Sequence, residues 1–132
     1  LTPLAEVPRR FGLDARKALG QHFLLDEATC NRVAMLAGEL AGRNVLEVGP
    51  GPGGLTRALL DRPLAHLTAV ELDERALAAL AELEAAHPGR LTVLRQDARR
   101  FDGLALPAPR MVVANLPYNV GTPLLIGWLR AL

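Results

Sequence analysis

The chain has 132 residues, of which 50% are hydrophobic and 22% are charged, a composition typical of one folded domain. Its 15 Lys and Arg residues nearly balance its 14 Asp and Glu residues, which argues against a strongly basic protein that wraps nucleic acid but allows a local basic patch. One cysteine, Cys30, excludes an intrachain disulfide and a cysteine-built metal site. No apolar run reaches the roughly 18 residues of a membrane helix, so we expect a soluble, cytoplasmic protein.

Segments with helix-like and strand-like patterns alternate along the chain. After a mixed N-terminal part, Asp26 is suited to cap a helix over 27–40, which carries apolar residues at helical spacing. Short apolar runs predict strands at 44–49, 66–71, 91–95 and 111–115. Helices are expected at 55–61 and 73–86, and a last one from about Thr122-Pro123. This alternation predicts an α/β fold with a parallel sheet of about four strands and right-handed crossovers.

Glycine or a polar side chain stands at the carboxyl end of each predicted strand. These positions are Gly49 to Gly51, Glu71, Asp97 and Asn115. In open parallel sheets the ligand binds beyond this edge, at the point where the strand order reverses. We therefore expect the four strand ends to form one ligand site.

The first strand runs into a glycine-rich turn over 49–54, and glycine lets the backbone approach a ligand closely. Its spacing differs from the G-x-G-x-x-G of dinucleotide enzymes, so the turn favours a nucleoside-type ligand; a plain strand-to-helix turn is the alternative. Glu71 lies 22 residues after Gly49 and is suited to accept hydrogen bonds from ribose hydroxyls. Its alternative role is to cap the next helix, for which Asp73 and Glu74 are better placed.

The other two strand ends carry groups that suit an adenine ring. Asp97 can accept a hydrogen bond from an adenine amino group, and an exposed turn aspartate is the alternative. After the fourth strand, Asn115-Leu116-Pro117-Tyr118 brings an amide, a proline and an aromatic ring into one turn. Tyr118 is the only tyrosine in the chain, which weakens the alternative of an ordinary turn with a core tyrosine.

In these segments the chain resembles the ribosomal RNA adenine dimethyltransferase family, which uses S-adenosylmethionine on small-subunit ribosomal RNA and has the erythromycin-resistance methylases as relatives. The matching segments run in family order over almost the whole chain. They are 17–24 (Lys-Ala-Leu-Gly-Gln-His-Phe-Leu), the glycine turn through Leu55-Thr56, 70–73 (Val-Glu-Leu-Asp), 96–98 (Gln-Asp-Ala) and 115–119 (Asn-Leu-Pro-Tyr-Asn). The resemblance implies a Rossmann-like, S-adenosylmethionine-dependent methyltransferase fold.

The resemblance also implies which residues bind the cofactor. Family contacts fall on positions that match His22, Leu24, Gly49, Glu71, Asp97 and Asn115, and the glycine turn adds Gly51. The family usually has asparagine where this chain has His22, and an imidazole at that position can still form a hydrogen bond.

The residue types of the last turn suit methylation of an adenine amine, which is a weak nucleophile because its lone pair is delocalised into the ring. The Asn115 side-chain oxygen and the Leu116 carbonyl could accept its hydrogens and draw the lone pair back to nitrogen, while Pro117 fixes the turn. Tyr118 would stack on the flipped base and Phe23 would flank its other face. Transfer of an electrophilic methyl group needs alignment more than a strong base, so we expect no metal.

The leading hypothesis is thus a ribosomal RNA adenine N6-dimethyltransferase whose partner is small-subunit ribosomal RNA or its precursor particle. An amino-methyltransferase on another RNA, on DNA or on a protein amide is the alternative within the enzyme class. A nucleic-acid-binding, transcription-factor-like protein that keeps the fold without catalysis is the alternative from another class. We expect residues 1–43 to contribute to the cofactor site and 44–132 to form a methyltransferase core truncated after its fourth strand, without the family's further strands and C-terminal helical domain.

Overall fold

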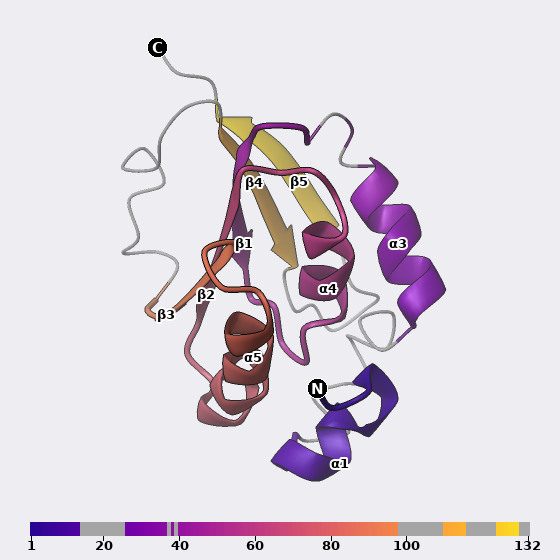
Figure 1. Ribbon diagram of the computed structural model, residues 1–132, viewed down its shortest axis with the longest axis vertical. Coiled ribbons are helices and arrows are strands. Elements are labelled where there is room, and N and C mark those ends of the chain that lie inside the picture. Colours follow the sequence, from indigo (N-terminus) through magenta and orange to yellow (C-terminus); the bar gives the residue numbers. More distant parts are fainter. Residues whose placement is uncertain (14–25, 37, 39, 98–109, 116–123, 130–132) are drawn as a thin grey trace.

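The computed structural model describes residues 1–13, 26–36, 38, 40–97, 110–115 and 124–129. A five-stranded sheet in the order β3-β2-β1-β4-β5 forms its centre (Figure 1). The strands are β1 (Asn44–Val48), β2 (His66–Glu71), β3 (Leu91–Arg95), β4 (Arg110–Asn115) and β5 (Leu124–Leu129). β1 to β4 run parallel and β5 runs antiparallel to β4. The α/β class and the four parallel strands expected from the sequence are confirmed.

Two helices connect the first three strands. α4 (Gly54–Leu60) joins β1 to β2, and α5 (Glu74–Ala86) joins β2 to β3. Both connections lead in the same direction across the sheet, so right-handed crossovers put both helices on one face. Figure 1 shows α4 and α5 against the sheet, with α3 (Glu27–Leu36) on the outer side of α4.

Side-chain caps and periodic apolar residues explain where the helices lie. The Asp73 carboxylate accepts hydrogen bonds from the N–H groups of Arg75 and Ala76, which makes it the N-cap of α5. The carboxylate of Asp26 likewise accepts from the N–H groups of Ala28 and Thr29 at the start of α3. Both caps were predicted from the sequence and are confirmed.

The helix expected over 27–40 is shorter than predicted, because α3 ends at Leu36. The Gly38 N–H group bonds to the Met35 carbonyl instead of continuing the helix. Leu36, one of the apolar residues at helical spacing, is 77% exposed, whereas Leu40 is buried beyond the helix. Apolar spacing alone therefore overestimated this helix by about one turn.

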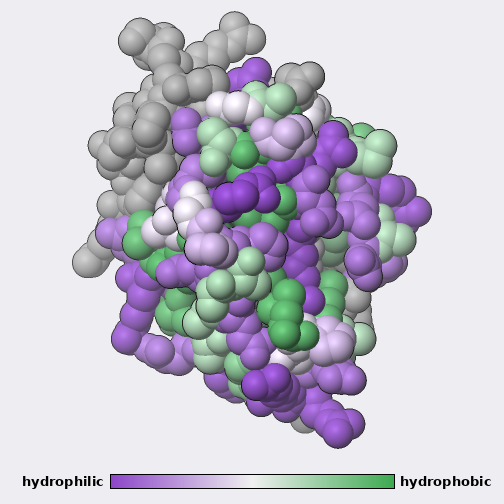
Figure 2. All heavy atoms as spheres, viewed as in Figure 1, coloured by the Kyte–Doolittle hydropathy of each residue, from purple (hydrophilic) through white to green (hydrophobic). Residues whose placement is uncertain are grey.

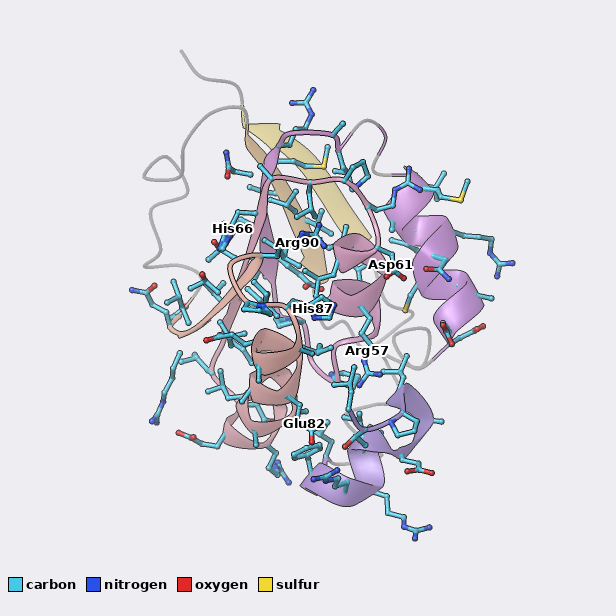
Figure 3. All side chains as sticks on the ribbon, in the orientation of Figure 1. Arg57, Asp61, His66, Glu82, His87 and Arg90 are labelled. Atoms are coloured by element: carbon cyan, nitrogen blue, oxygen red, sulfur yellow. The ribbon has the colours of Figure 1, made fainter. Side chains whose placement is uncertain are left out.

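The N-terminal segment comprises η1 (Leu4–Glu6) and α1 (Val7–Phe11), and α1 packs on α5. Arg57 of α4 donates to the Thr2 carbonyl over 2.7 Å. The Thr2 N–H group in turn donates to a Glu82 carboxylate oxygen of α5 over 3.1 Å. Figure 3 shows Arg57 and Glu82 on the side of their helices that faces this segment. These polar contacts fix the segment to both helices at once.

The hydrophobic core lies between the sheet and the helices. Its buried members come from α3, β1, α4, β2, α5, β3 and β4, and the largest include Leu55, Leu59, Leu67, Leu80 and Leu83. On the face seen in Figure 2, hydrophilic residues predominate and hydrophobic residues form small patches between them. The core therefore supports the strands from the helix side and holds their carboxyl ends in register.

The helix predicted from Thr122-Pro123 is wrong, because the backbone of 124–129 forms β5. Its register with β4 runs from Arg110↔Leu129 to Asn115↔Leu124. A six-residue apolar run fits a buried strand as well as a helix, and pairing satisfies the backbone groups along β4. The sheet consequently has five strands rather than about four, and β5 covers the outer edge of β4.

Candidate functional site

The register of the sheet brings three predicted site residues to one level. Val48 pairs with Val70 of β2 and with Ala114 of β4. The next residues, Gly49, Glu71 and Asn115, therefore stand side by side at the carboxyl ends of three adjacent strands. The strand order reverses here, because β2 and β4 lie on opposite sides of β1.

The glycine turn folds tightly over the end of β1. Gly49, Gly51 and Gly53 have φ angles of +68°, +55° and +92°, which side chains other than glycine rarely adopt. The Gly49 N–H group donates to the Val70 carbonyl over 3.1 Å, and the Gly53 N–H group donates to the Pro50 carbonyl over 3.0 Å. The local sequence thus forms a fixed backbone cradle at the strand edge.

Glu71 joins this cradle to the end of β2. Its Oε1 accepts from the Gly51 N–H group over 3.0 Å, while Oε2 accepts from the N–H groups of Leu72 and Asp73 over 2.9 and 3.2 Å. A carboxylate offers about four acceptor positions, so these three bonds leave room for one more. Two ribose hydroxyls would therefore displace one internal bond. Asp73 is the N-cap of α5, so Glu71 is not needed for that role.

Asp97 lies just beyond β3 and is half-buried. The N–H group of the preceding residue, Gln96, donates to the Glu71 carbonyl over 3.1 Å. This bond brings the turn after β3 next to the end of β2. Asp97 and Glu71 therefore belong to neighbouring strand ends, as the sequence predicted.

Asn115 ends β4, and its backbone pairs with Leu124 of β5. The other predicted catalytic residues, Leu116, Pro117 and Tyr118, lie outside the described residues, as do His22, Phe23 and Leu24. Their roles in cofactor binding, catalysis and base stacking remain predictions.

A buried acid that we had not assigned to the site lies directly below the cradle. Glu47 of β1 is 1% exposed, and its Oε1 accepts from the Thr56 hydroxyl of α4 over 2.6 Å. Its Oε2 has no hydrogen-bond partner among the described residues. Burial raises the pKa of Glu47 to about 8, the Thr56 hydrogen bond opposes this shift, and the negative charge of Glu71 adds to it. A single charged residue inside an apolar strand was the sequence signal for this group.

Two histidines away from the carboxyl ends of the strands, His66 and His87, have structural partners. His66 contacts the Gly89 carbonyl through Nδ1 and the Thr92 hydroxyl through Nε2, and His87 contacts the Leu83 carbonyl. These contacts give both histidines structural roles. Within the ranges that the structure describes, no group of three or more His, Cys, Asp or Glu residues could hold a metal ion.

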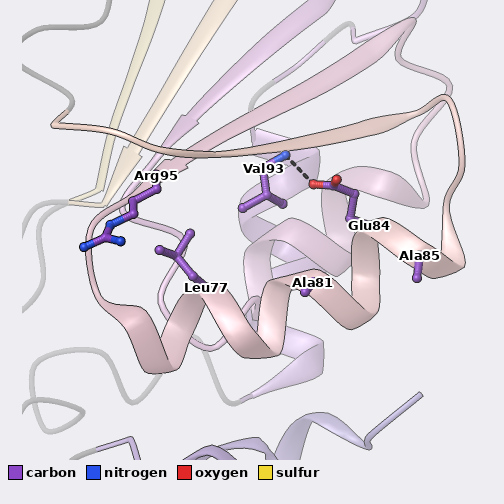
Figure 4. A pocket seen from close by; sticks show the side chains of 6 residues that line it. All are labelled: Leu77, Ala81, Glu84, Ala85, Val93 and Arg95. Carbon is purple, nitrogen blue, oxygen red and sulfur yellow. Dashed lines mark hydrogen bonds between the residues drawn. The ribbon is translucent and has the colours of Figure 1, made fainter.

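A hollow of about 500 Å³ lies away from the cradle, between α5 and the edge strand β3 (Figure 4). It is lined by Leu77, Ala81, Glu84, Ala85, Val93 and Arg95. The Glu84 carboxylate accepts from the Val93 N–H group over 2.6 Å, which caps a donor of the sheet edge. None of the predicted site residues lines this hollow, so we place the candidate site at the strand ends.

Comparison with known proteins identifies relatives of the chain. The family model of ribosomal RNA adenine dimethylase matches residues 12–131. The ribosomal RNA small subunit methyltransferase A of Gluconobacter oxydans (strain 621H) is 59% identical over 131 residues, which are 98% of this chain and 43% of that protein. Its namesake from Paramagnetospirillum magneticum (strain ATCC 700264 / AMB-1) is 54% identical, with 47% of its length covered. The chain thus spans slightly less than half the length of these curated relatives.

The solved structure of the 23S rRNA methyltransferase ErmE is 28% identical in sequence and superposes with a TM-score of 0.51. The match covers 67% of this chain and 46% of the ErmE chain. Magnesium protoporphyrin IX methyltransferase from Synechocystis PCC 6803, solved with bound S-adenosylmethionine, matches 80% of this chain and 62% of its own with a TM-score of 0.52. At 16% identity the second likeness concerns the fold alone. The Rossmann-like methyltransferase fold implied by the resemblance is confirmed. No helix in the described part of the chain is long and apolar enough to span a membrane.

Proposed function

The chain belongs to the ribosomal RNA adenine dimethylase family, and from that premise we propose that it carries the cofactor site and catalytic turn of an S-adenosylmethionine-dependent enzyme that dimethylates the N6 amine of adenosines in small-subunit ribosomal RNA. The observation that carries this proposal is the alignment of Gly49, Glu71 and Asn115 at one sheet edge. Small-subunit RNA or its precursor particle would be the partner, in the cytoplasm.

The residues of the sheet edge fit an adenosine cofactor. The backbone cradle over β1 leaves no Cβ at Gly49 or Gly51, and Glu71, which bonds to Gly51, has about one acceptor position left beside its three internal bonds. Glu71 would hold the ribose hydroxyls and Asp97 the adenine amino group. His22 and Leu24 would add contacts from the N-terminal part, so that 1–43 and 44–132 act as one unit.

When bound, S-adenosylmethionine supplies a methyl group made electrophilic by its sulfonium. The chain's own residues would bind and orient the two reactants. Asn115 and the Leu116 carbonyl would accept hydrogen bonds from the target amine, and Tyr118 and Phe23 would hold the base between them. These interactions strengthen as the amine nitrogen becomes tetrahedral, which lowers the barrier to transfer.

A binding protein without catalysis is less well supported. Glu71 in such a protein would have only its bonds to Gly51, Leu72 and Asp73 to maintain. An asparagine at the end of β4, directly followed by Leu116-Pro117-Tyr118, has no evident purpose in phosphate binding. Methylation of another RNA, of DNA or of a protein amide uses the same amine chemistry and differs only in substrate.

The test is methyl transfer from labelled S-adenosylmethionine to small-subunit RNA in a protein that carries this whole sequence. We expect Asn115→Ala to lower the rate at saturating cofactor on the order of a hundredfold, because it removes an acceptor needed in the transition state. Asn31→Ala, on the exposed face of α3, is the matched control. Wild-type turnover in Asn115→Ala would refute the catalytic assignment, and transfer only to another substrate would favour the alternative enzyme.

A further inference from the structure

Glu47 is a carboxyl group for which the proposed function provides no role. It lies on β1 two residues before Gly49, is 1% exposed, and is bonded to Thr56 in the first turn of α4. The glycine turn connects these two elements, so the Glu47–Thr56 bond closes the base of the turn. The second carboxyl oxygen has no partner among the described residues. A buried carboxylate with one hydrogen bond is strongly disfavoured relative to the neutral acid.

The surroundings of Glu47 contain no compensating cation in the described ranges. Its neighbours in register are Ala69 of β2 and Val113 of β4. The titratable groups that act on it or respond to it are Glu71 of β2 and the buried thiol of Cys30 on α3. Burial raises the pKa of Cys30 to about 12, so that thiol is neutral as well. Glu47 therefore lies in an environment that favours its protonated form at neutral pH.

Burial is the main cause of the raised pKa of Glu47, and the negative charge of Glu71 adds a smaller contribution in the same direction. Glu71 bonds to Gly51 of the cradle, and Glu47 lies on β1 two residues before Gly49, so a charged group bound over the cradle would act on both carboxylates. A positive charge there would act in the opposite sense to Glu71 and favour the ionised form of Glu47. Charge at the strand edge and the proton on Glu47 are thus thermodynamically linked.

We propose that Glu47 is a proton-linked positioning residue, protonated in the ligand-free protein, that releases its proton to solvent when a cationic adenosine sulfonium occupies the strand edge. This inference rests on the proposed function for the nature of the ligand. Methyl transfer converts the sulfonium into a neutral thioether and leaves the Glu47 carboxylate without a compensating charge. Glu47 then regains a proton from solvent, so the linkage weakens binding of the neutral product relative to binding of the cationic substrate.

The direct test is a carbon-13 NMR titration of the Glu47 carboxyl in the wild-type chain, with its resonance assigned through the Val48 backbone. We expect a midpoint near the pKa of about 8 without ligand. The midpoint should be about one unit lower with S-adenosylmethionine and nearly unchanged with S-adenosylhomocysteine. Equal midpoints with both ligands, or a ligand-free carboxyl already ionised at about pH 6, would overturn the inference.

Affinity measurements give a second readout. By linkage, the affinity ratio of S-adenosylmethionine to S-adenosylhomocysteine should rise by up to about tenfold between about pH 6 and pH 9 in the wild type. The amino groups of the ligands also titrate, so the readout is the difference between the wild type and Glu47→Gln. The part of the rise that comes from Glu47 should be absent from Glu47→Gln. Thr56→Val should move the rise to higher pH, because the Thr56 bond lowers the pKa of Glu47.

The exposed Glu6→Gln variant is the control for loss of a carboxylate and should behave like the wild type. The same pH dependence in Glu47→Gln and in the wild type would refute the linkage. If both variants still bound both ligands, the cofactor assignment would stand. Failure of the wild type to bind either ligand would refute the proposed function itself. If Glu47→Gln does not fold, the wild-type NMR titration alone decides the question.

Discussion

At the level of a single residue, Glu71 has one observed structural role and one proposed role in ligand binding. Its bonds to Gly51, Leu72 and Asp73 hold the cradle against the end of β2 before any ligand is present. The same carboxylate is the group proposed to hold the ribose. Hydrogen bonds already made to its oxygens reduce the reorganisation that ligand binding requires, because the carboxylate is fixed in place.

Replacing Glu71 by alanine should weaken cofactor binding by about tenfold to a hundredfold, since charge-assisted hydrogen bonds contribute roughly 1.5–3 kcal/mol. Calorimetry with S-adenosylhomocysteine measures the change. Glu74→Ala is the matched control, because Glu74 lies three residues away, exposed and paired with Arg95 over 2.6 Å. Unchanged affinity in a folded Glu71→Ala variant would show that this carboxylate serves the cradle alone.

Local chemistry explains which site residues could be predicted from the sequence. Glu71 could be separated from Asp73 because a helix needs one N-cap and Asp73 fits that position better. Glu47 could not be assigned in the same way. Its significance depends on burial and on Thr56, nine residues away, and both follow from packing rather than from local sequence.

At the level of elements, the central βαβ units follow their local sequence closely. β2 and β3 have the predicted bounds, and the predicted strand at 111–115 begins one residue earlier. Turn and cap residues mark both ends of these elements, and the middle residues of β1 and β2 are buried, as expected for apolar central strands. Thr122-Pro123 precedes the C-terminal run at 124–129 and suits the start of a helix, whereas the pairing of this run with β4 is a tertiary preference that periodicity does not report.

The glycine turn also depends on α5. A Cβ added at Gly53 would lie 2.9 Å from the Leu83 Cδ1 atom and 3.4 Å from the Leu80 Cδ2 atom, both in side chains that are fully buried. Gly53 also has a φ of +92°, so alanine there meets both backbone strain and a clash. The close approach of this turn to α5 fixes where α4 begins.

We expect Gly53→Ala to lower the free energy of unfolding by about 1–3 kcal/mol more than Gly89→Ala. Gly89 is the matched control because its φ is +78° but an added Cβ meets nothing within 4 Å. Both variants then carry the backbone strain, roughly 1–2 kcal/mol, and only Gly53→Ala adds the clash. Urea unfolding measures the difference, and equal losses would mean that Leu83 and Leu80 repack without cost.

For the whole molecule, net charge and length bear on the RNA substrate. The formal net charge is +1, and the chain spans 43% of the Gluconobacter protein. Affinity for RNA comes largely from cationic contacts with phosphates, which a nearly neutral chain supplies sparsely. We expect the 132-residue chain to bind S-adenosylmethionine but to methylate small-subunit RNA at least about tenfold more slowly than the full Gluconobacter protein. Equal rates in the two would show that these residues suffice for RNA recognition.

The stability of the whole molecule should depend on pH through Glu47. The pKa of this acid is about 8 in the folded chain against 4.5 for the unperturbed group, so the folded state keeps a proton that the unfolded state has lost. The contribution of Glu47 to stability is therefore largest below about pH 4.5 and declines as the pH rises towards 8. The decline is at most about 1.4 kcal/mol per pH unit for one proton.

Among the described residues, the other carboxyl and thiol groups with shifted pKa values act outside this window or in the opposite sense. Hydrogen bonds lower the pKa values of Asp26 and Glu82 in the folded state. These two groups therefore stabilise the folded state at a pH above the ordinary carboxyl pKa, and this stabilisation is lost in acid. The raised pKa of Cys30, about 12, affects stability only in strong alkali. Between about pH 5 and pH 8, Glu47→Gln should therefore remove most of the decline seen in the wild type, and Glu6→Gln should not. Urea unfolding across this range measures both slopes, and parallel curves for the wild type and Glu47→Gln would show that Glu47 is ionised in the folded chain.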